Sequence, residues 1–547
     1  MPGLEEAFEL IGEAVEHHLP QTHAAGFALA VTDPEDVLGV VVRGLADVGA
    51  SAPVRPETRF EIGSISKSFA GVIAVQEGEA GRLDLDVSIN DLLPWLGLAE
   101  PFGTITQHHL MTHTSGLPIG TEESPTGPGA LAILRTLAPT SPPGERFWYS
   151  NDGWKLVGAV LERSTGAPMH ELLRERILTP LGMTSTEGAI TNETRLNLAV
   201  GYEPVFDDRP AHLGHPLAPA RWLVSNTADG SIVSNVIDMS AYVRMLLGRG
   251  STLVGGHETT ILSPAGFARF VEPRVLMDEP GAHRGERYGY GVWTSEEDGR
   301  AFVTHSGGMV GYTALLMVDV DTGIGAIALQ NGGGDKKPVV RYALDAVRAA
   351  LRGEPVVAMP HPPAPTAIGS APSLAGIYVG YREIELVATD DGLRLRDGAI
   401  GVELERWPDA DDAFLVPHPA RDRYLLRVLR DAEGAVTELV HGPDRFVPAG
   451  RALEGETPPP DGWVGREGLY RSNNPWAPTL RIFARGGELW FLAPPDGVEE
   501  RLTPRDDGSF AVGEPEAPQR LTFLDEIEGV STVVVFNGGR WYRALDA

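Results

Sequence analysis

Cysteine is absent from this chain of 547 residues. Disulfide bonds, thiolate metal sites and a cysteine nucleophile are therefore excluded, although the cellular compartment stays open. Lysine is scarce as well, because only four of the 45 basic residues are lysines: Lys67, Lys155, Lys336 and Lys337. Since the chain otherwise supplies its cations as arginine, a lysine inside a motif carries unusual weight here.

Long apolar runs and a basic leader are also missing. No segment reaches the roughly 18 apolar residues that a membrane-spanning helix needs. Residues 1–6 are acidic and contain no basic n-region, so we expect no secretory signal and take the cytoplasm as the expected location. With 42% hydrophobic and 22% charged residues, the composition is that of a globular protein rather than a disordered one.

Basic residues are outnumbered by acidic ones, and the formal net charge is −30. This charge repels phosphate backbones and anionic lipids, so we expect neither nucleic acid nor membrane surfaces as partners. An acidic protein could favour a cationic substrate such as a free amine, but solubility through net charge is the simpler explanation.

The length predicts two or three domains, because it exceeds what one hydrophobic core supports. Apolar runs predict one hairpin from residues 26–31 and 37–42 and a second from residues 313–320 and 324–329. Helical periodicity is found in residues 4–19, 64–78, 151–164, 169–177, 235–247 and 338–351. The pattern predicts an α+β domain, in which distant parts of the chain build one sheet around an inserted helical subdomain.

The last third of the chain has a different pattern. Six prolines in residues 354–372 predict a linker, and short alternating strands with turn residues follow it. Gly376-Ile377-Tyr378 matches Gly468-Leu469-Tyr470, and Arg445-Phe446 matches Arg540-Trp541, which indicates an internal repeat. We therefore predict an N-terminal domain over residues 1–353, the linker over 354–372, and two small β-barrel or sandwich modules over 373–450 and 461–547.

The first chemical motif lies where a predicted helix begins. Ser-x-x-Lys spacing puts Ser64 and Lys67 on one helix face, one turn apart. Backbone N–H groups at the helix start can bind a developing oxyanion, and a desolvated lysine can accept the serine proton. By itself the spacing is weak, because an N-capping serine followed by a surface lysine explains it better.

A second motif, Tyr149-Ser150-Asn151, follows a proline-rich turn and precedes another helical pattern. Such a loop tip can present a phenol for proton transfer and an amide for positioning a substrate carbonyl. An asparagine N-cap beside a packed tyrosine explains it equally well.

The third motif, His305-Ser306-Gly307-Gly308, stands just ahead of the second hairpin. A strand of small residues lets a substrate backbone lie against it, and the Gly308 N–H could complete an oxyanion hole. The alternative is a glycine turn with a solvated histidine.

In this order the three motifs resemble the penicillin-recognising serine enzymes, which include class C β-lactamases, D,D-peptidases, D-aminopeptidases and related esterases. The second motif has the Tyr form, and the third has His-x-Gly where lactamases usually have Lys-Thr-Gly. Residues 109–117, 230–234 and 288–293 also look familiar. The resemblance covers about residues 5–352 and implies a β-lactamase/transpeptidase-like domain, with an antiparallel sheet flanked by helices.

The resemblance implies roles for the reacting residues. Ser64 is the nucleophile that forms an acyl-enzyme. Lys67 is either the proton acceptor or the charge that lowers the pKa of Tyr149. Tyr149 is then the base for acylation and the acid for the leaving group. The sequence leaves open whether Lys67 or Tyr149 takes the first proton.

It also implies the residues that hold the substrate. Asn151 orients it, His305 and Gly307 line it, and the N–H groups of Ser64 and Gly308 form the oxyanion hole. His305 replaces the lactamase lysine, which weakens the anchoring of a substrate carboxylate and so weakens the case for β-lactamase activity.

A domain of this type followed by two β-modules resembles bacterial D-aminopeptidases, whose barrels are lipocalin-like. We therefore expect an aminopeptidase or amidase that acts on D-amino-acid-containing peptides or amides, takes a small-molecule or short-peptide substrate, and uses no cofactor. A carboxylesterase or acyl transferase on the same scaffold, a catalytically silent sensor or binding module, and a homodimer all stay open.

Two pairs of histidines have spacings that metals can use: His109 with His113, and His212 with His215. No carboxylate pattern supports either pair, and no glutamate follows His109 as in the zinc peptidase motif. We predict no metal site, a structural role for the first pair and solvated loop histidines for the second.

Overall fold

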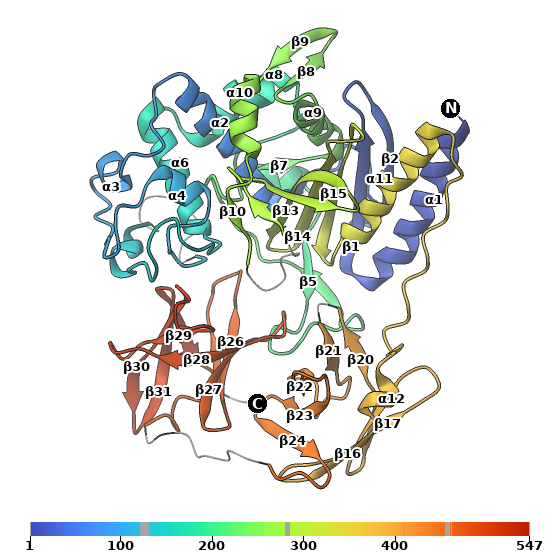
Figure 1. The fold of residues 1–547 in the computed structure, drawn as a ribbon, viewed down its shortest axis with the longest axis vertical. Coiled ribbons are helices and arrows are strands. Elements are labelled where there is room, and N and C mark those ends of the chain that lie inside the picture. The colour runs from blue at the N-terminus through green and yellow to red at the C-terminus, as the bar shows by residue number, and fades with distance from the viewer. Residues whose placement is uncertain are drawn as a thin grey trace. The chain divides into compact units, whose positions relative to one another are not determined.

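The computed structural model describes residues 2–120, 131–278, 285–408, 410–453, 460 and 462–545. They form two compact units: Met1–Glu203 with Leu217–His361, and Pro204–Pro216 with Pro362–Ala547 (Figure 1). The predicted domain boundaries stay predictions, and Asp461, Asp546 and Ala547 of the last predicted module lie outside the described residues. No helix in the described ranges is both long and apolar enough to cross a membrane.

The first unit is built on a nine-stranded antiparallel sheet in the order β10-β11-β12-β13-β14-β15-β1-β2-β3. Its strands are β1 (His23–Thr32), β2 (Val37–Asp47), β3 (Ala52–Pro53), β10 (Val275–Leu276), β11 (Arg287–Tyr288), β12 (Trp293–Glu297), β13 (Arg300–Met309), β14 (Tyr312–Asp319) and β15 (Ile324–Gly333). Both predicted hairpins form, and β1 pairs with β15, with Phe27 opposite Gln330. This pairing joins the two ends of the unit into one sheet, as expected.

Ten helices of the first unit are described. They are α1 (Pro2–His18), α2 (Ser66–Glu79), α3 (Ile89–Leu92), α4 (Gln107–Met111), α6 (Asn151–Thr165), α7 (Met169–Leu173), α8 (Thr179–Leu181), α9 (Val236–Leu247), α10 (Pro264–Val271) and α11 (Lys337–Arg352). Single 3-10 or π turns lie at Leu19–Gln21, Gly63–Ile65, Ala132–Thr136, Arg174–Leu178 and Thr194–Asn197. Short antiparallel pairs join β4 (Phe60–Glu61) to β7 (Val233–Ser234), β5 (Tyr202–Pro204) to β6 (Leu217–Pro219), and β8 (Ser251–Val254) to β9 (His257–Thr260).

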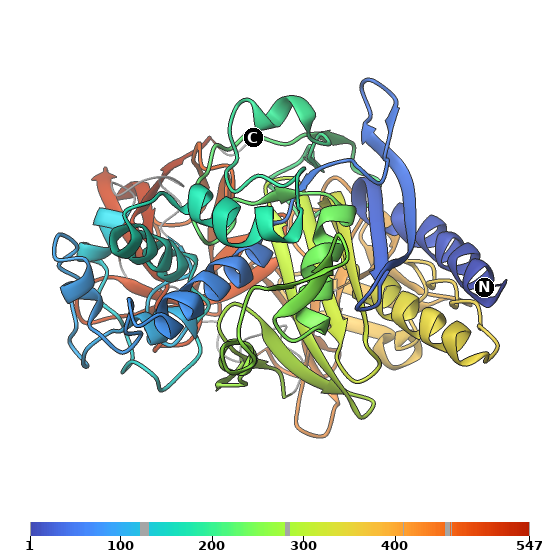
Figure 2. The ribbon, with the colours of Figure 1, turned by 90° about the horizontal axis from the view of Figure 1, so that it is seen from above.

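Alternate side chains of β1 face opposite sides of the sheet, as the pleat of a strand requires. Phe27 and Leu29 pack in the core that α1 and α11 cover, whereas Ala28 and Ala30 belong to the larger core on the other side. Figure 2 shows α1 in blue and α11 in yellow together on one side of the sheet, with the remaining helices opposite. Because β1 is buried on both faces, its sequence is a continuous apolar run.

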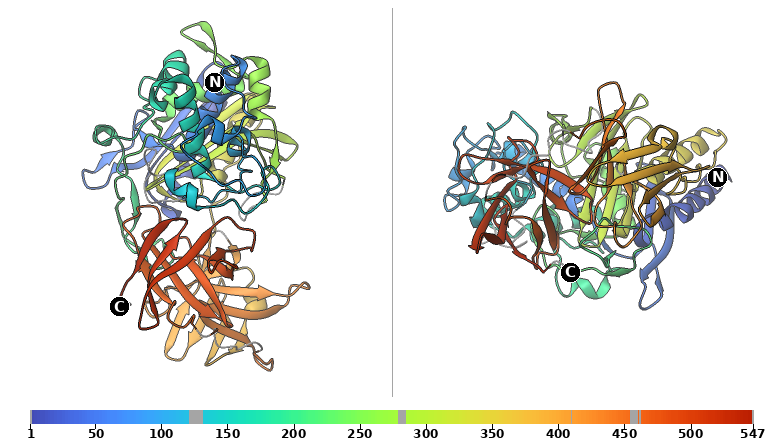
Figure 3. Two further views of the ribbon diagram at one scale, coloured as in Figure 1. Left: turned by 90° about the vertical axis from the view of Figure 1, so that its left-hand side faces the viewer. Right: turned by 90° about the horizontal axis from the view of Figure 1, so that it is seen from below.

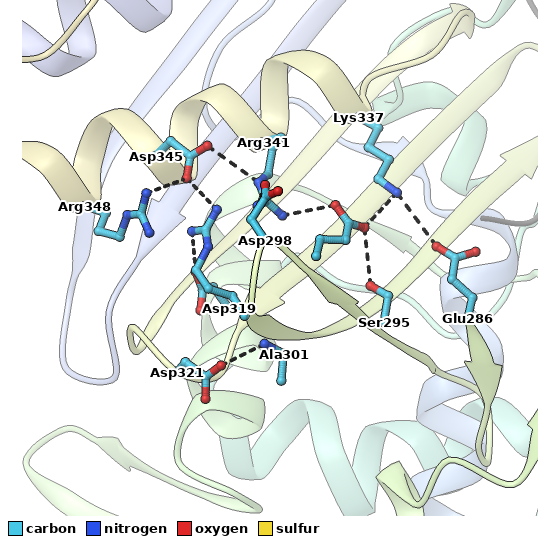
Figure 4. Close-up of polar contacts among 12 residues, drawn as sticks. Glu286, Ser295, Asp298, Ala301, Asp319, Asp321, Lys337, Arg341, Asp345 and Arg348 are labelled. Carbon is cyan, nitrogen blue, oxygen red and sulfur yellow. Dashed lines mark hydrogen bonds and ion pairs between the residues drawn. The ribbon is translucent and has the colours of Figure 1, made fainter. Parts of the chain in front are cut away.

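Ion pairs fasten α11 to the strands beneath it (Figure 4). Arg300 on β13 pairs with Asp319 and with Asp345 on α11, at 2.7 Å in each case. Arg341 on α11 pairs with Asp298 at 3.0 Å, at the turn between β12 and β13. The helix therefore holds the strand that carries the third motif.

The second unit contains two antiparallel β-modules, coloured orange and red (Figure 3). The first is a nine-stranded sheet of β16 (Gly376–Val379), β17 (Glu383–Ala388), β18 (Leu393–Asp397), β19 (Ile400–Glu403), β20 (Glu405–Trp407), β21 (Ala410–Leu415), β22 (Leu426–Arg430), β23 (Val436–His441) and β24 (Asp444–Pro448), preceded by α12 (Ala371–Leu374). The second is a closed barrel of β25 (Gly468–Arg471), β26 (Thr479–Arg485), β27 (Glu488–Ala493), β28 (Val498–Pro504), β29 (Phe510–Val512), β30 (Arg520–Ile527), β31 (Val530–Phe536) and β32 (Gly539–Arg543). The prediction of two C-terminal barrel-like modules is confirmed.

The sequence repeat corresponds to a repeated structure. In each module the first strand pairs with the last, β16 with β24 and β25 with β32. The repeated tyrosines also have the same contact, because Tyr378 donates to the Leu374 carbonyl and Tyr470 to the Arg466 carbonyl, four residues earlier in each case.

Candidate active site

Ser64 lies in the single turn that precedes α2, and strand β13 packs directly against this turn. Gly63 has a positive φ of 54°, and a Cβ atom there would lie 2.5 Å from the Gly308 carbonyl oxygen. A Cβ atom on Gly307 would lie 1.9 Å from the Ile62 carbonyl oxygen. Only glycines permit this approach, which brings the third motif to the nucleophile although the two are far apart in the chain.

Lys67 is fully buried, and its Nζ donates three hydrogen bonds of 2.8 Å: to Ser64 Oγ, to Asn151 Oδ1 and to the Asp229 carbonyl oxygen. Burial lowers the pKa of Lys67 to about 7, with the Asp229 carboxylate opposing this shift and the Lys155 charge adding to it. Neutral and charged lysine therefore coexist near pH 7. In its neutral form Nζ has a lone pair that can accept the Ser64 proton.

These contacts exclude the alternative for the first motif, in which Ser64 is an N-cap and Lys67 a surface lysine. Ser64 makes no capping hydrogen bond to α2, and Lys67 is buried rather than a surface lysine. The alternative for the second motif is an Asn151 N-cap beside a packed tyrosine. Its first half is wrong, because Ser150 and not Asn151 caps α6, by accepting the Gly153 N–H. Since Asn151 Oδ1 accepts from Lys67, its Nδ2 is directed elsewhere and can donate to a substrate carbonyl.

Tyr149 lies beside Lys67, whose Nζ is 5.0 Å from the centre of the tyrosine ring. The fully buried His113 also lies beside it, and its ring stacks on the Tyr149 ring at 4.1 Å between centroids. His113 Nδ1 accepts the Ser150 backbone N–H at 2.8 Å. The structural role predicted for His113 thus has a mechanism, because this residue holds the loop that carries Tyr149.

His305 is buried, and both of its ring nitrogens have protein partners. Nδ1 lies 2.5 Å from the Ser306 carbonyl oxygen and must donate, so in the neutral ring Nε2 accepts the Tyr288 hydroxyl at 2.8 Å. Burial, and next the positive charge of Lys67, lower the pKa of His305 to about 3. His305 is therefore uncharged at neutral pH.

The structure brings Ser64, Lys67, Asn151, Gly307 and Gly308 together, and the Tyr149 ring lies beside Lys67. His305 lies on the same strand as Gly307 and Gly308 and contacts Tyr288. Sequence reasoning gave no role to two further residues of the site, Asp229 and Tyr288, and gave His113 only a structural one. His113 and Tyr288 fall in stretches noted as familiar, and Asp229 directly precedes another, so a search for polar residues in and around those stretches could have found them.

The histidine pairs have other partners. His109 forms a capping box with Thr106 at the start of α4, which supports a structural role. His212 Nε2 lies 3.0 Å from Glu405 Oε2 in the second unit, so this histidine is ion-paired rather than simply solvated. Within the described ranges, no group of three histidine, aspartate or glutamate side chains has the arrangement of a metal site.

The family model called Beta-lactamase matches residues 10–350. The chain belongs to the beta-lactamase family. Penicillin-binding protein 4 of Amycolatopsis lactamdurans is 28% identical over 379 residues, which cover 66% of this chain and 94% of that protein. The resemblance inferred from the motifs is thus confirmed, and members of this family are serine hydrolases.

Solved structures of beta-lactamase-like proteins share the fold of this family member. The octameric penicillin-binding protein homologue from Pyrococcus abyssi is 25% identical with a TM-score of 0.58, over 80% of this chain and 99% of that one. The D-amino acid amidase from Ochrobactrum anthropi SV3, solved with L-phenylalanine amide, is 23% identical with a TM-score of 0.51, over 63% and 98%. The second likeness is one of fold alone.

Proposed function

We propose that this beta-lactamase family member is a serine hydrolase that forms an acyl-enzyme through Ser64 and cleaves D-amino-acid-containing peptides or amides. One observation carries the proposal. Ser64 Oγ lies 2.8 Å from the ammonium nitrogen of a fully buried lysine, and burial lowers the pKa of that lysine to about 7. A base with a pKa near the working pH is what activation of a serine hydroxyl needs.

In the proposed acylation, Ser64 Oγ attacks the substrate carbonyl carbon while its proton passes to neutral Lys67 or to Tyr149. The N–H groups of Ser64 and Gly308 stabilise the oxyanion, and Asn151 Nδ2 positions the carbonyl. Collapse of the tetrahedral intermediate breaks the carbon–nitrogen bond, and the leaving amine takes the proton that Ser64 gave up. Water then hydrolyses the Ser64 ester by the same route.

The chemistry of His305 supports an amidase or peptidase over a lactamase. A neutral, fully engaged histidine stands at the third motif, where lactamases usually have a lysine that could hold a substrate carboxylate. The C-terminal barrels, which resemble those of D-aminopeptidases, favour the same substrate class. That a D-amino acid amidase has this fold is consistent with the proposal but adds no argument about the substrate.

The test compares D-alanine p-nitroanilide with short p-nitrophenyl esters, with Ser64→Ala as the inactive control. Turnover of the anilide, together with an acyl adduct of Ser64 seen by intact mass, is the expected result. Ester turnover alone would reject the peptidase proposal in favour of a carboxylesterase or acyl transferase. A chain that a fluorophosphonate probe does not label at Ser64 would instead be a silent sensor or binding module.

We further propose a cytoplasmic location, and a homodimer stays open. Fractionation of the source cells and light scattering of the purified chain test these two points.

A further inference from the structure

Asp229 contributes both its backbone and its charge to the surroundings of Lys67. Its carbonyl oxygen accepts Lys67 Nζ at 2.8 Å, so its backbone is two hydrogen bonds from the reacting oxygen of Ser64. The residue is half-buried, and its Oδ1 atom is enclosed without a hydrogen-bond partner. In the described parts of the chain, no hydrogen bond or ion pair satisfies the Asp229 carboxylate.

An enclosed carboxylate oxygen without a partner destabilises the fold, because folding removes the water that bound it and supplies no hydrogen bond in exchange. The charge of Lys67 offsets part of this cost, because the Asp229 carboxylate interacts with it and raises the pKa of Lys67. That compensation is lost when Lys67 becomes neutral, which is the state that can accept the Ser64 proton. The active form of the site therefore holds the Asp229 carboxylate without the Lys67 charge.

We propose that Asp229 binds the α-ammonium group of the substrate, and so selects peptides and amides with a free amino terminus. In an α-amino amide the nitrogen lies about 2.5 Å from the carbonyl carbon that Ser64 attacks, across one tetrahedral carbon. A carboxylate beside the Ser64–Lys67 pair is thus within reach of that ammonium. The inference rests on the proposed function and adds the group that the substrate must have.

Charges elsewhere agree with this selection. His305 is neutral, so the third motif offers no cation to a substrate carboxylate. The net charge of −30 raises the concentration of cations near the protein. A substrate whose amine is acylated would leave the Asp229 carboxylate unpaired beside a neutral amide.

The experiment uses two anilides that differ by one amine: D-alanine p-nitroanilide and propionic acid p-nitroanilide. We expect kcat/KM of the natural chain to favour the amine by about 10- to 100-fold, the range of a hydrogen bond between charged groups. In Asp229→Asn the ratio should fall to about one. Asp91→Asn removes the same charge from an exposed position on α3 and should keep the ratio.

The pH dependence separates binding from a mere electrostatic effect on Lys67. For the amine substrate, kcat/KM should fall above pH about 8, where an α-amino group loses its proton. The propionyl substrate should show no such fall, and Asp229→Asn should remove it. An Asp229 that only adjusts Lys67 would change both substrates alike and leave their ratio unaltered.

Equal kcat/KM for the two anilides in the natural chain would overturn the proposal, whether or not Asp229→Asn folds. A preference that persists in a folded Asp229→Asn would overturn it as well. If the natural chain cleaves neither anilide, the proposed amidase function fails, and the p-nitrophenyl esters of alanine and propionic acid still test Asp229 through the same ratio.

Discussion

At the scale of single residues, the chemistry depends on how burial changes Lys67. An ammonium with three hydrogen bonds would keep its proton at neutral pH if it were exposed, whereas burial brings its pKa to about 7. The Asp229 carboxylate acts in the opposite direction and raises the pKa of Lys67. The lysine is thereby able both to take a proton and to return it.

The protonation state of Lys67 predicts how kcat/KM depends on pH below and around neutrality. Protonated Lys67 cannot accept the Ser64 proton, so kcat/KM for an ester without an amine should rise with pH through about 7. Lys67→Arg should lower kcat by about 100- to 10,000-fold, since a guanidinium stays charged at every accessible pH. Initial rates between pH 5 and 9 check both, and a profile that is flat across this range would contradict the role of Lys67.

The Tyr288 hydroxyl donates a hydrogen bond to His305, and removing this hydroxyl should lower the stability of the fold. Both residues are fully buried, and Tyr288→Phe would leave His305 Nε2 without a partner. We expect a loss of about 1–3 kcal/mol in the free energy of unfolding, measured with urea. Tyr381→Phe is the matched control, because Tyr381 is 69% exposed and its loss should change stability by less than about 0.5 kcal/mol. Equal effects of the two variants would contradict this account.

At the scale of elements, the ion pairs that hold α11 to the sheet contribute unequally to the free energy of unfolding (Figure 4). Arg300→Met should cost about 3–5 kcal/mol, because it leaves Asp319, which is 1% exposed, as an uncompensated buried charge. Arg341→Met should cost only about 1 kcal/mol, because its partners Glu297, Asp298 and Asp345 are 26%, 88% and 39% exposed and Glu297 keeps its ion pair with Lys337. Urea unfolding of both variants checks the ranking, and a larger loss for Arg341→Met would contradict it.

The helices and hairpins were predictable where the signal is local. Apolar periodicity placed α6 and α11 within a residue or two of their observed ends, and both hairpins formed as expected. The short strands β10, β11 and β12 were not predicted. Their two to five residues carry too little pattern. They are strands because each adds to the edge that the next one offers, β12 to β13, β11 to β12 and β10 to β11.

The site was predictable where a motif supplies it. The Ser64–Lys67 spacing and the Tyr149–Asn151 loop indicate their chemistry directly, although their catalytic roles stay proposals. His113 and Asp229 act through burial and through contacts with distant segments, such as the contact between Asp229 and Lys67 across 162 positions. No pattern of neighbouring residues encodes such a contact.

At the scale of the whole molecule, the chain crosses between its two units before the linker. Pro204–Pro216 belongs to the second unit although its neighbours on both sides belong to the first. Within the second unit, Arg209 pairs with Asp422 at 2.8 Å, and Arg471 pairs with Asp207 at 3.0 Å. The segment is thus tied to both β-modules, and a chain cut at the linker would lose these partners.

The pair between His212 and Glu405 should make this attachment depend on pH. The hydrogen bond and charge of Glu405, with a smaller contribution from Asp422, raise the pKa of His212 above 6.5 against the effect of burial, and the His215 ring lies 5.4 Å away. Because the folded-state pKa is the higher one, the stabilisation is complete below pH 6.5 and is lost as pH rises through the raised pKa.

Hydrogen exchange of peptides from Pro204–Pro216 measures the effect, after correction for the intrinsic rate at each pH. Protection should decline between pH 6 and 8 in the natural chain. In His212→Gln it should be lower at pH 6 and should no longer change with pH, and Glu405→Gln should behave in the same way. Peptides from the β30–β31 hairpin, far from His212 in sequence, serve as the internal reference. If the natural chain and His212→Gln have the same protection at pH 6, the ion pair does not hold the segment.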